Sequence, residues 1–381
     1  MKIAGIIAEY NPFHQGHKYQ LEKARQLGFT HIVAVMSGNI VQRGDIAILD
    51  AHTRARAAVQ NGADLVIELP PPYSASSAAD FAEAGVRILS GLGCVDSLVF
   101  GSECGDINRL IGCSNALKTA SGDEIPKLMS EGLTYPQAIC TAFPEYKDIF
   151  EGANNTLAVE YINALEGTGI KPVTVKRTVG HDSTAASGRY ASASSIRKLM
   201  LCGENVSDFV PFEFSSGDIS GVCVVDGIVL FNIASMSREQ ILLSPYMSDG
   251  VGERIASLVK TASTVSELCA SVKTKNVTLS RVRRAVLLAA LGVKASDLKK
   301  PVPYARVLAA NQRGFEILKE CKKSGSISVS QSLARLSQQS EHSKRCAELT
   351  ELASLLRHFA RVGKDCGYVS EYERQIEKVF I

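Results

Sequence analysis

The alternation of short apolar runs with helix-forming stretches in the first half of the chain is the feature that most constrains the fold. Runs rich in Val and Ile occupy residues 2–8, 31–36, 65–69 and 97–100, and stretches with helical spacing fill 18–27, 53–61 and 77–89. Repeated β-α-β units of this kind predict a parallel sheet covered on both faces, to which a later strand at 172–176 is expected to belong. Ligands of such sheets bind at the carboxyl ends of the strands. The loops after these strands are therefore the places to look for function.

The pattern changes after about residue 205. Residues 221–234 permit another strand, but residues 250–381 indicate mainly helix, for example 280–291, which ends at Gly292. We expect an α/β protein with two domains. A Rossmann-like parallel-sheet domain spans 1–205 and a mainly helical, basic domain spans 206–381.

Charge is distributed unevenly between these parts. Residues 251–381 hold 23 Lys and Arg against 12 Asp and Glu, a balance of +11, whereas residues 1–250 carry −8, giving the chain its formal +3. A basic helical region favours a polyanion partner, with nucleic acid as the leading candidate; a well-solvated lysine-rich surface explains the charge equally well. The residues expected to contact nucleic-acid phosphates are Lys273, Lys275, Arg281 and Arg284.

Cysteine usage and hydropathy indicate a reduced, cytoplasmic protein. The ten cysteines lie between Cys94 and Cys366 with no C-x-x-C pair and no metal-ligand spacing. The apolar start of the chain ends at Glu9 and is too short for a signal peptide, and Asp226 interrupts the other long apolar run. We therefore expect no membrane association and no protein-bound metal centre; the sequence does not indicate the oligomeric state.

A phosphate-binding turn is expected between the first strand and the first helix, at residues 10–16. The helix start offers unpaired N–H groups and a positive dipole end, and Gly16 allows close approach to the backbone. His14 and His17 lie three residues apart on one face and are expected to donate hydrogen bonds to charge developing on an α-phosphate. Two histidines at this spacing also suit a metal, but no third ligand is evident nearby.

Arginines at two later positions suit the same task. Arg177 ends the strand at 172–176, and Arg197 lies where a helix begins, after Ser194, which is either its N-cap or a phosphate ligand.

These segments resemble a known family. The run His14-Gln15-Gly16-His17 is similar to the HxGH signature of the nucleotidyltransferase superfamily, whose fold is of the HUP type, and Ser194-Ser195-Ile196-Arg197 is similar to its S-x-I-R signature. The resemblance narrows to the bacterial tRNA(Met) cytidine acetate ligases through segments along most of the chain, at residues 9–14, 36–39, 42–44, 64–70, 100–103, 154–155, 176–177, 273–284 and 304–308.

The resemblance implies an ATP-dependent ligase that forms acetyl-adenylate and acetylates the wobble cytidine of elongator tRNA(Met) to N4-acetylcytidine, with ATP and Mg²⁺ and acetate as co-substrate. His14, His17 and Arg197 would be catalytic. The implied ATP contacts are Ile7, Ala8, Glu9, Tyr10, Asn11, Pro12, Phe13, His14, Gln15, Gly16, His17, Lys18, Tyr19, Gln20, Gly101, Asn154 or Asn155, Arg177, Ser194 and Arg197. The chain departs from the family pattern at Ala51, where a lysine is expected. If that lysine assists acetate or phosphate binding, either Arg54 or Arg56 substitutes for it or the activity is weaker.

Two other functions remain open on the sequence alone. A metabolic adenylyltransferase of the same fold would make a dinucleotide cofactor from ATP and a phosphorylated small molecule, but would not require a basic helical region. An RNA-binding protein with a vestigial nucleotide site is the third hypothesis, and the intact His14, Gly16, His17 and Arg197 argue against it.

Overall fold

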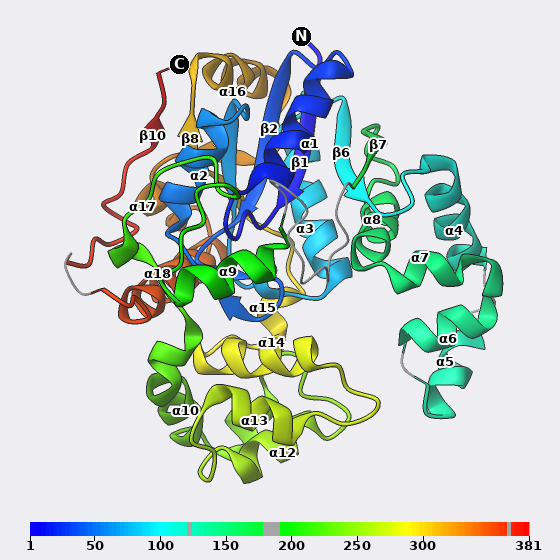
Figure 1. The fold of residues 1–381 in the computed structure, drawn as a ribbon, viewed down its shortest axis with the longest axis vertical. Coiled ribbons are helices and arrows are strands. Elements are labelled where there is room, and N and C mark those ends of the chain that lie inside the picture. The colour runs from blue at the N-terminus through cyan, green and yellow to red at the C-terminus, as the bar shows by residue number, and fades with distance from the viewer. Residues whose placement is uncertain (120–123, 134, 178–190, 364–366, 381) are drawn as a thin grey trace.

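A central sheet of eight strands organises the protein. The computed structural model describes residues 1–119, 124–133, 135–177, 191–363 and 367–380. The strand order is β10-β8-β5-β2-β1-β6-β7, with β9 paired to β8 (Figure 1). The strands are β1 (Ile3–Ala8), β2 (His31–Ser37), β5 (Leu65–Leu69), β6 (Ser97–Ser102), β7 (Lys171–Lys176), β8 (Tyr304–Ala310), β9 (Ser328–Ser330) and β10 (Glu377–Lys378). The five expected strands are present and mutually parallel, which confirms the predicted α/β class.

Helices cover both faces of the sheet because successive strand residues point to opposite sides. Ile3 and Ile7 of β1 pack in the cluster formed with α3 (Ala78–Gly91) and α8 (Ala153–Ala164). Ala4 and Ile6 pack instead with α1 (Gln15–Gln26) and α2 (Ala51–Gln60). The loops that follow the parallel strands consequently open at one edge of the sheet.

The C-terminal region returns to this sheet, which the sequence did not predict. Strand β8 lies antiparallel to β5, with Glu68 opposite Arg306, and β9 and β10 pair with β8. The alanine-rich sequence of β8 favours helix by propensity, but all seven of its residues are buried in the sheet. Arg306 is tolerated there because its guanidinium forms ion pairs with Glu68 (3.1 Å) and Glu371 (2.9 Å).

Residues 222–291 form a separate group of helices. These are α10 (Asp226–Ala234), α11 (Arg238–Leu242), α12 (Val251–Leu258), α13 (Val265–Val272) and α14 (Leu279–Ala290), at the end of the molecule away from α16 (Gln312–Ser324) in Figure 1. The strand expected within 221–234 is wrong. The residues buried on one side of these helical turns are Val225, Val229, Leu230 and Ile233. Their helical spacing decides the structure, although the β-branched composition of the segment favours a strand.

This helical group docks on the loop after β2 through a close backbone contact. The hairpin of β3 (Ile40–Val41) and β4 (Asp45–Ile46) turns at Gly44, whose φ is +72°. A Cβ atom at Gly44 would lie 2.4 Å from the backbone nitrogen of Arg284 in α14, so only glycine fits. The division of the chain near residues 205 and 206 remains a prediction.

The remaining helices, in chain order, are α4 (Ile107–Thr119), α5 (Glu124–Ser130), α6 (Tyr135–Ala142), α7 (Lys147–Glu151), α9 (Ala193–Leu201), α15 (Ala295–Leu298), α17 (Leu333–Ser337) and α18 (Glu341–Phe359); short 3-10 turns lie at Tyr73–Ala75, Pro144–Tyr146, Ser216–Asp218 and Val222–Val225. In the part of the chain that the structure describes, no helix combines the length and the apolar character needed to cross a bilayer.

Candidate functional site

A cavity of about 510 Å³ opens where β1, β6 and β7 end. Its volume lies in the range of small-molecule sites, roughly 300–1,000 Å³. The expected residues that line it are Ile7, Ala8, Glu9, Tyr10, Asn11, His14, His17, Gln20, Gly101, Asn154, Arg177 and Ser194. The expected residues that do not line the cavity are Pro12, Phe13, Gln15, Gly16, Lys18, Tyr19, Asn155 and Arg197. The turn after β1 therefore meets Gly101, Asn154, Arg177 and Ser194 at one site.

His14 and His17 are built into the start of α1. His14 is the N-cap residue: its Nδ1 accepts the N–H of Gly16 (3.0 Å), while the N–H of His14 donates to Nδ1 of His17 (3.3 Å). This is a capping box with histidines in both side-chain roles. Gly16 is required because a Cβ atom there would lie 2.9 Å from His14 Cε1. The turn is therefore more buried than a solvent-facing loop, with His14 only 7% exposed.

Both imidazoles are held neutral. Burial, reinforced by Arg177 and Arg197, lowers the pKa of His14 to about 3. Burial and the adjacent His14 and Arg177 lower the pKa of His17 well below its ordinary value. Because each Nδ1 accepts a backbone N–H, the single ring proton of each residue lies on Nε2. Two neutral N–H donors therefore belong to residues of the cavity wall, where charge can be stabilised without proton transfer.

Arginines supply the positive charge of the site. Arg177 and Arg43 line the cavity, and burial lowers the pKa of the Arg177 guanidinium, whose Nε is buried and has no hydrogen-bond partner among the described residues. Arg197 lies beside the cavity and joins α9 to the phosphate-binding turn. Its Nη1 donates to the carbonyl of Asn11 (2.8 Å) and its Nη2 to Ser194 Oγ (3.2 Å). Ser192, and not Ser194, is the N-cap of α9, which leaves Ser194 Oγ to accept from Arg197 and from Arg43 (3.4 Å).

The two asparagines after α7 have different environments. Asn154 lines the cavity, whereas Asn155 is 2% exposed and accepts the backbone N–H of Glu103 (2.9 Å) through Oδ1. Glu103 in turn accepts from the Asn154 amide (2.6 Å) and from the Asn155 N–H (2.7 Å). This reciprocal lock fixes the loop after β6 next to Gly101, and the geometry favours Asn154 as the ligand-facing residue.

Ala51 and its neighbours lie outside the cavity. Ala51 is the buried first residue of α2. Arg54 is fully buried and donates to the carbonyls of Glu9 (2.7 Å), Ser37 (3.1 Å), Leu49 (2.9 Å) and Gly38. Arg56 lies at the surface, 3.8 Å from Glu377. The expectation that Arg54 or Arg56 substitutes for a lysine at the ligand is therefore wrong, because one holds loops together and the other faces away.

The four basic residues expected to contact nucleic acid do not form one surface. Lys273 and Lys275 are exposed in the segment before α14. Arg281 forms an ion pair with Asp249 (2.8 Å), and Arg284 lines the cavity together with Ser280. Arg281 and Arg284 have different surroundings, because the Arg284 side of α14 docks on the loop after β2, and contact of either residue with nucleic acid remains a prediction.

The cavity also has a wall that sequence reasoning missed. Ala78 and Phe81 of α3, Phe100, Leu157 and Tyr161 give it apolar lining. The loop after β5 was expected at the ligand edge, and α3 follows that loop, so this wall carried a sequence signal. No sequence signal indicated that α14 contributes to the cavity wall, because this depends on how helices far apart in the sequence pack together.

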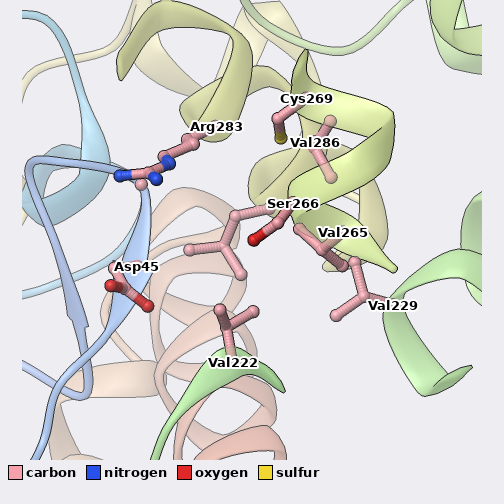
Figure 2. A pocket seen from close by; sticks show the side chains of 10 residues that line it. Asp45, Val222, Val229, Val265, Ser266, Cys269, Arg283 and Val286 are labelled. Atoms are coloured by element: carbon pink, nitrogen blue, oxygen red, sulfur yellow. The ribbon is translucent and has the colours of Figure 1, made fainter. Parts of the chain in front are cut away.

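A second, smaller cavity of about 60 Å³ lies between the β3–β4 hairpin and the helices α10, α13 and α14. Figure 2 shows Asp45 and Arg283 beside it, together with Val222, Val229, Val265, Ser266, Cys269 and Val286. Burial raises the pKa of the Asp45 carboxyl. The space suits water molecules and excludes a nucleotide.

Metal ligands are not gathered in the described residues. Within 1–119, 124–133, 135–177, 191–363 and 367–380, no group of three or more His, Cys, Asp or Glu side chains is placed to hold an ion. Among the described residues, the one carboxylate on the wall of the larger cavity is that of Glu9.

Comparison with known proteins decides the family. The sequence model described as HIGH Nucleotidyl Transferase matches residues 1–364. A protein of Acetivibrio thermocellus named tRNA(Met) cytidine acetate ligase is 36% identical over 363 residues, covering 86% of this chain and 87% of its own. The chain belongs to the tRNA(Met) cytidine acetate ligase family of HIGH nucleotidyltransferases. A relative of the same name from Clostridium kluyveri is 34% identical, with 86% and 89% covered.

Solved structures agree with this family assignment. The apo crystal structure of Thermotoga maritima TmcAL superimposes with a TM-score of 0.92 at 27% identity, covering all of both chains. A second crystal structure of Thermotoga maritima TmcAL, bound with alpha-thio ATP, gives a TM-score of 0.89 at 27% identity, again covering all of both chains. This chain therefore has the same fold as a relative whose crystal structure contains an ATP analogue.

Proposed function

We propose that this protein is an ATP-dependent acetate ligase that forms acetyl-adenylate and then acetylates the wobble cytidine of elongator tRNA(Met) to N4-acetylcytidine. The observation that carries the proposal is the pair of neutral histidines at the start of α1, stacked with ring centroids 3.8 Å apart on the wall of the cavity. Relatives named tRNA(Met) cytidine acetate ligase support the choice of reaction, and the analogue-bound neighbour supports ATP as substrate.

The first step needs charge stabilisation and no general base. An acetate oxygen forms a bond to the α-phosphorus of ATP, the bond from that phosphorus to the bridging oxygen breaks, and pyrophosphate leaves with the electron pair. Acetate is already ionised at neutral pH, so no proton has to be removed. The Nε2–H groups of His14 and His17 and the N-terminus of α1 would stabilise the charge on the α-phosphate.

The arginines would act at the leaving group. Arg177 on the cavity wall and Arg197 beside it would neutralise the outgoing pyrophosphate. Mg²⁺ would be held chiefly by the phosphates of ATP, since Glu9 is the one carboxylate that the described residues place on the cavity wall and Mg²⁺ characteristically binds through one or two carboxylates plus substrate phosphates. The ion would add positive charge to the same leaving group.

The second step would bring tRNA to the acyl-adenylate. The exposed Lys273 and Lys275, next to the helix that reaches the cavity, support a phosphate-contacting role there. The dinucleotide-synthesising alternative is not favoured, because the curated relatives carry the acetate ligase name. We place the activity in the cytoplasm, where tRNA and ATP are available.

The test measures each step separately. Purified protein is incubated with ATP, Mg²⁺ and acetate, and acetate-dependent exchange of labelled pyrophosphate into ATP is followed without tRNA. Bulk tRNA is then added, and nucleosides are analysed by mass spectrometry. Exchange with acetate together with N4-acetylcytidine in tRNA(Met) supports the proposal. Exchange that requires a phosphorylated small molecule instead of acetate would contradict it.

A further inference from the structure

Arg284 is a cation inside the cavity that the proposed ATP contacts do not use. It extends from α14, one turn after Ser280, and both residues line the 510 Å³ cavity. The arginine is half-buried, and no carboxylate of the described residues lies within ion-pair distance of it. Its Nη1 makes one long hydrogen bond to the carbonyl of Gln42 (3.4 Å), and its Nε is buried with no hydrogen-bond partner in the described part of the chain.

Contact with Tyr246 holds the Arg284 side chain in place. The guanidinium carbon lies 5.3 Å from the centre of the Tyr246 ring. The hydroxyl of Tyr246 accepts the N–H of Ser77 (2.7 Å) and donates to Asp80 Oδ2 (3.1 Å), which ties it to the start of α3. Asp80 is also held by the hydroxyl of Ser77 (2.7 Å). Arg284 is therefore positioned next to the N-terminus of α3, with its hydrogen-bonding capacity largely unused.

The neighbouring wall is apolar. Ala78 and Phe81 from the first turn of α3 line the cavity near this point, and Phe81 is 2% exposed. A fork-shaped cation beside a small apolar surface matches a short carboxylic acid, because a guanidinium binds a carboxylate through two parallel hydrogen bonds. It matches an RNA backbone less well, since a strand of phosphates needs an open track and the half-buried Arg284 side chain lines a cavity.

We infer that Arg284 binds the carboxylate of the acyl substrate, with the methyl group directed towards Ala78 and Phe81. This inference rests on the proposed function and names the acid-binding part of the same cavity. The carboxylate is held by the helical group while ATP is held by the sheet edge and α1. The bond-forming atoms, the acetate oxygen and the α-phosphorus, would then be brought together by the docking of α14 on Gly44.

Acetate-dependent ATP–pyrophosphate exchange without tRNA tests the inference in the full-length protein. For Arg284→Gln, the KM for acetate is expected to rise about ten- to hundredfold, the size of one charge-assisted hydrogen-bonded contact. The Kd for ATP should stay within about twofold. Arg284→Lys keeps the charge and loses the fork, so it should recover only part of the acetate affinity.

Arg281→Gln is the matched control. It removes the same charge from the same helix, but Arg281 faces Asp249 and does not line the cavity; its acetate KM should equal that of the unmodified protein. Phe81→Leu gives an independent readout, because more room beside the methyl group should shift the kcat/KM ratio towards propionate by up to roughly tenfold. Melting temperatures of all variants show that each is folded.

The outcomes separate the two proposals. An unchanged acetate KM in Arg284→Gln, with normal exchange in the unmodified protein, overturns the carboxylate site alone. A raised Kd for ATP would assign Arg284 to the phosphates, and a loss confined to tRNA affinity would assign it to RNA; both overturn the inference. Absence of acetate-dependent exchange in the unmodified protein overturns the proposed function itself, and the acyl site with it.

Discussion

The imidazole rings of His14 and His17 stack 3.8 Å apart at an angle of 25°. Two imidazolium ions would repel each other at this distance, and each ring has already used Nδ1 to accept a backbone N–H. The arrangement therefore selects neutral rings with the proton on Nε2. The signature residues thus cap the helix through one nitrogen and present a hydrogen-bond donor through the other.

The first prediction concerns acid stability. The folded-state pKa of His14 is about 3, below its ordinary value of 6.5, so between these two pH values the unfolded chain binds the additional proton. The contribution of His14 to the free energy of unfolding is therefore fully present above pH 6.5 and is lost as the pH falls towards 3. From this residue alone, the free energy of unfolding should be about 2 kcal/mol lower at pH 5 than at pH 8.

His14→Asn tests that value, because asparagine is also a good N-cap and does not titrate. Urea unfolding of both proteins at pH 5 and pH 8 should show a smaller acid loss in the variant. The carboxyl of Asp50, whose pKa is lowered by Arg374 and Arg357 against the effect of burial, stays ionised between pH 5 and pH 8 and does not contribute to the difference. Equal acid losses would mean that His14 is not held neutral by the fold.

The second prediction separates capping from catalysis at His17. Glutamine is a natural third residue of a capping box, so His17→Gln should keep the acceptor for the His14 N–H while removing the donor at the cavity. Pyrophosphate exchange should fall about a hundred- to thousandfold, as for loss of one transition-state donor. Unfolding in urea should be almost unchanged.

His17→Ala is the companion variant, since it removes both functions. It should lose the same activity and also about 1 kcal/mol of stability, because the His14 N–H becomes unpaired. If His17→Gln retains normal exchange, His17 serves only as a cap.

The third prediction concerns Arg54, which ties the phosphate-binding turn to the loop after β2. Its guanidinium donates to four backbone carbonyls, including those of Glu9 and Gly38. Lysine cannot reach these acceptors at once, and a buried acceptor without a donor costs about 1–3 kcal/mol. We expect Arg54→Lys to lower the free energy of unfolding by about 3 kcal/mol, measured in urea.

Arg56→Lys is the control for Arg54. It makes the same change two residues later, on the exposed side of α2 near Glu377, and should alter stability by less than about 0.5 kcal/mol. A similar loss in both variants would show that the α2 surface, and not the clamp, is responsible.

Local patterns allowed much of this site to be predicted. The strand, turn and helix around residues 3–26 follow from periodicity and a glycine, and these depend on neighbours in the sequence. The burial of His14 could not be predicted, because its surroundings form only when distant segments of the chain meet in the folded protein. The N-cap of α9 is Ser192 and not Ser194. The sequence could not distinguish them, because three of the four residues 192–195 are serines, which are equivalent as N-caps.

Nonlocal pairing explains the remaining differences. Strand β8 is defined by pairing with β5, more than 200 residues earlier in the chain, and by the ion pairs of Arg306 with Glu68 and Glu371. Arg284 belongs to a basic run in the sequence, and only the docking of α14 on Gly44 places it in the cavity. Charge counting cannot distinguish such a residue from the exposed lysines nearby.

The last prediction concerns the basic surface that remains after Arg281 and Arg284 are set aside. Lys273 and Lys275 are exposed, so we expect them to contact tRNA phosphates. Each lost contact should lower the slope of log affinity against log salt by about 0.7–0.9, so Lys273→Gln with Lys275→Gln should remove up to about 1.8. Affinity should fall most at low salt, and ATP–pyrophosphate exchange without tRNA should be unaffected, because neither lysine lines the cavity.

Lys322→Gln with Lys323→Gln provides the matched control. Both lysines lie in the last turn of α16, at the opposite end of the molecule from α13 and α14 in Figure 1, and their replacement changes the net charge equally. A general field effect would weaken tRNA binding in both double variants, whereas direct contacts would weaken it only in the first. Binding is measured from 50 to about 300 mM salt, where long-range attraction is increasingly screened. Equal slopes in the two variants would leave Lys273 and Lys275 as solvated surface residues and move the tRNA site elsewhere.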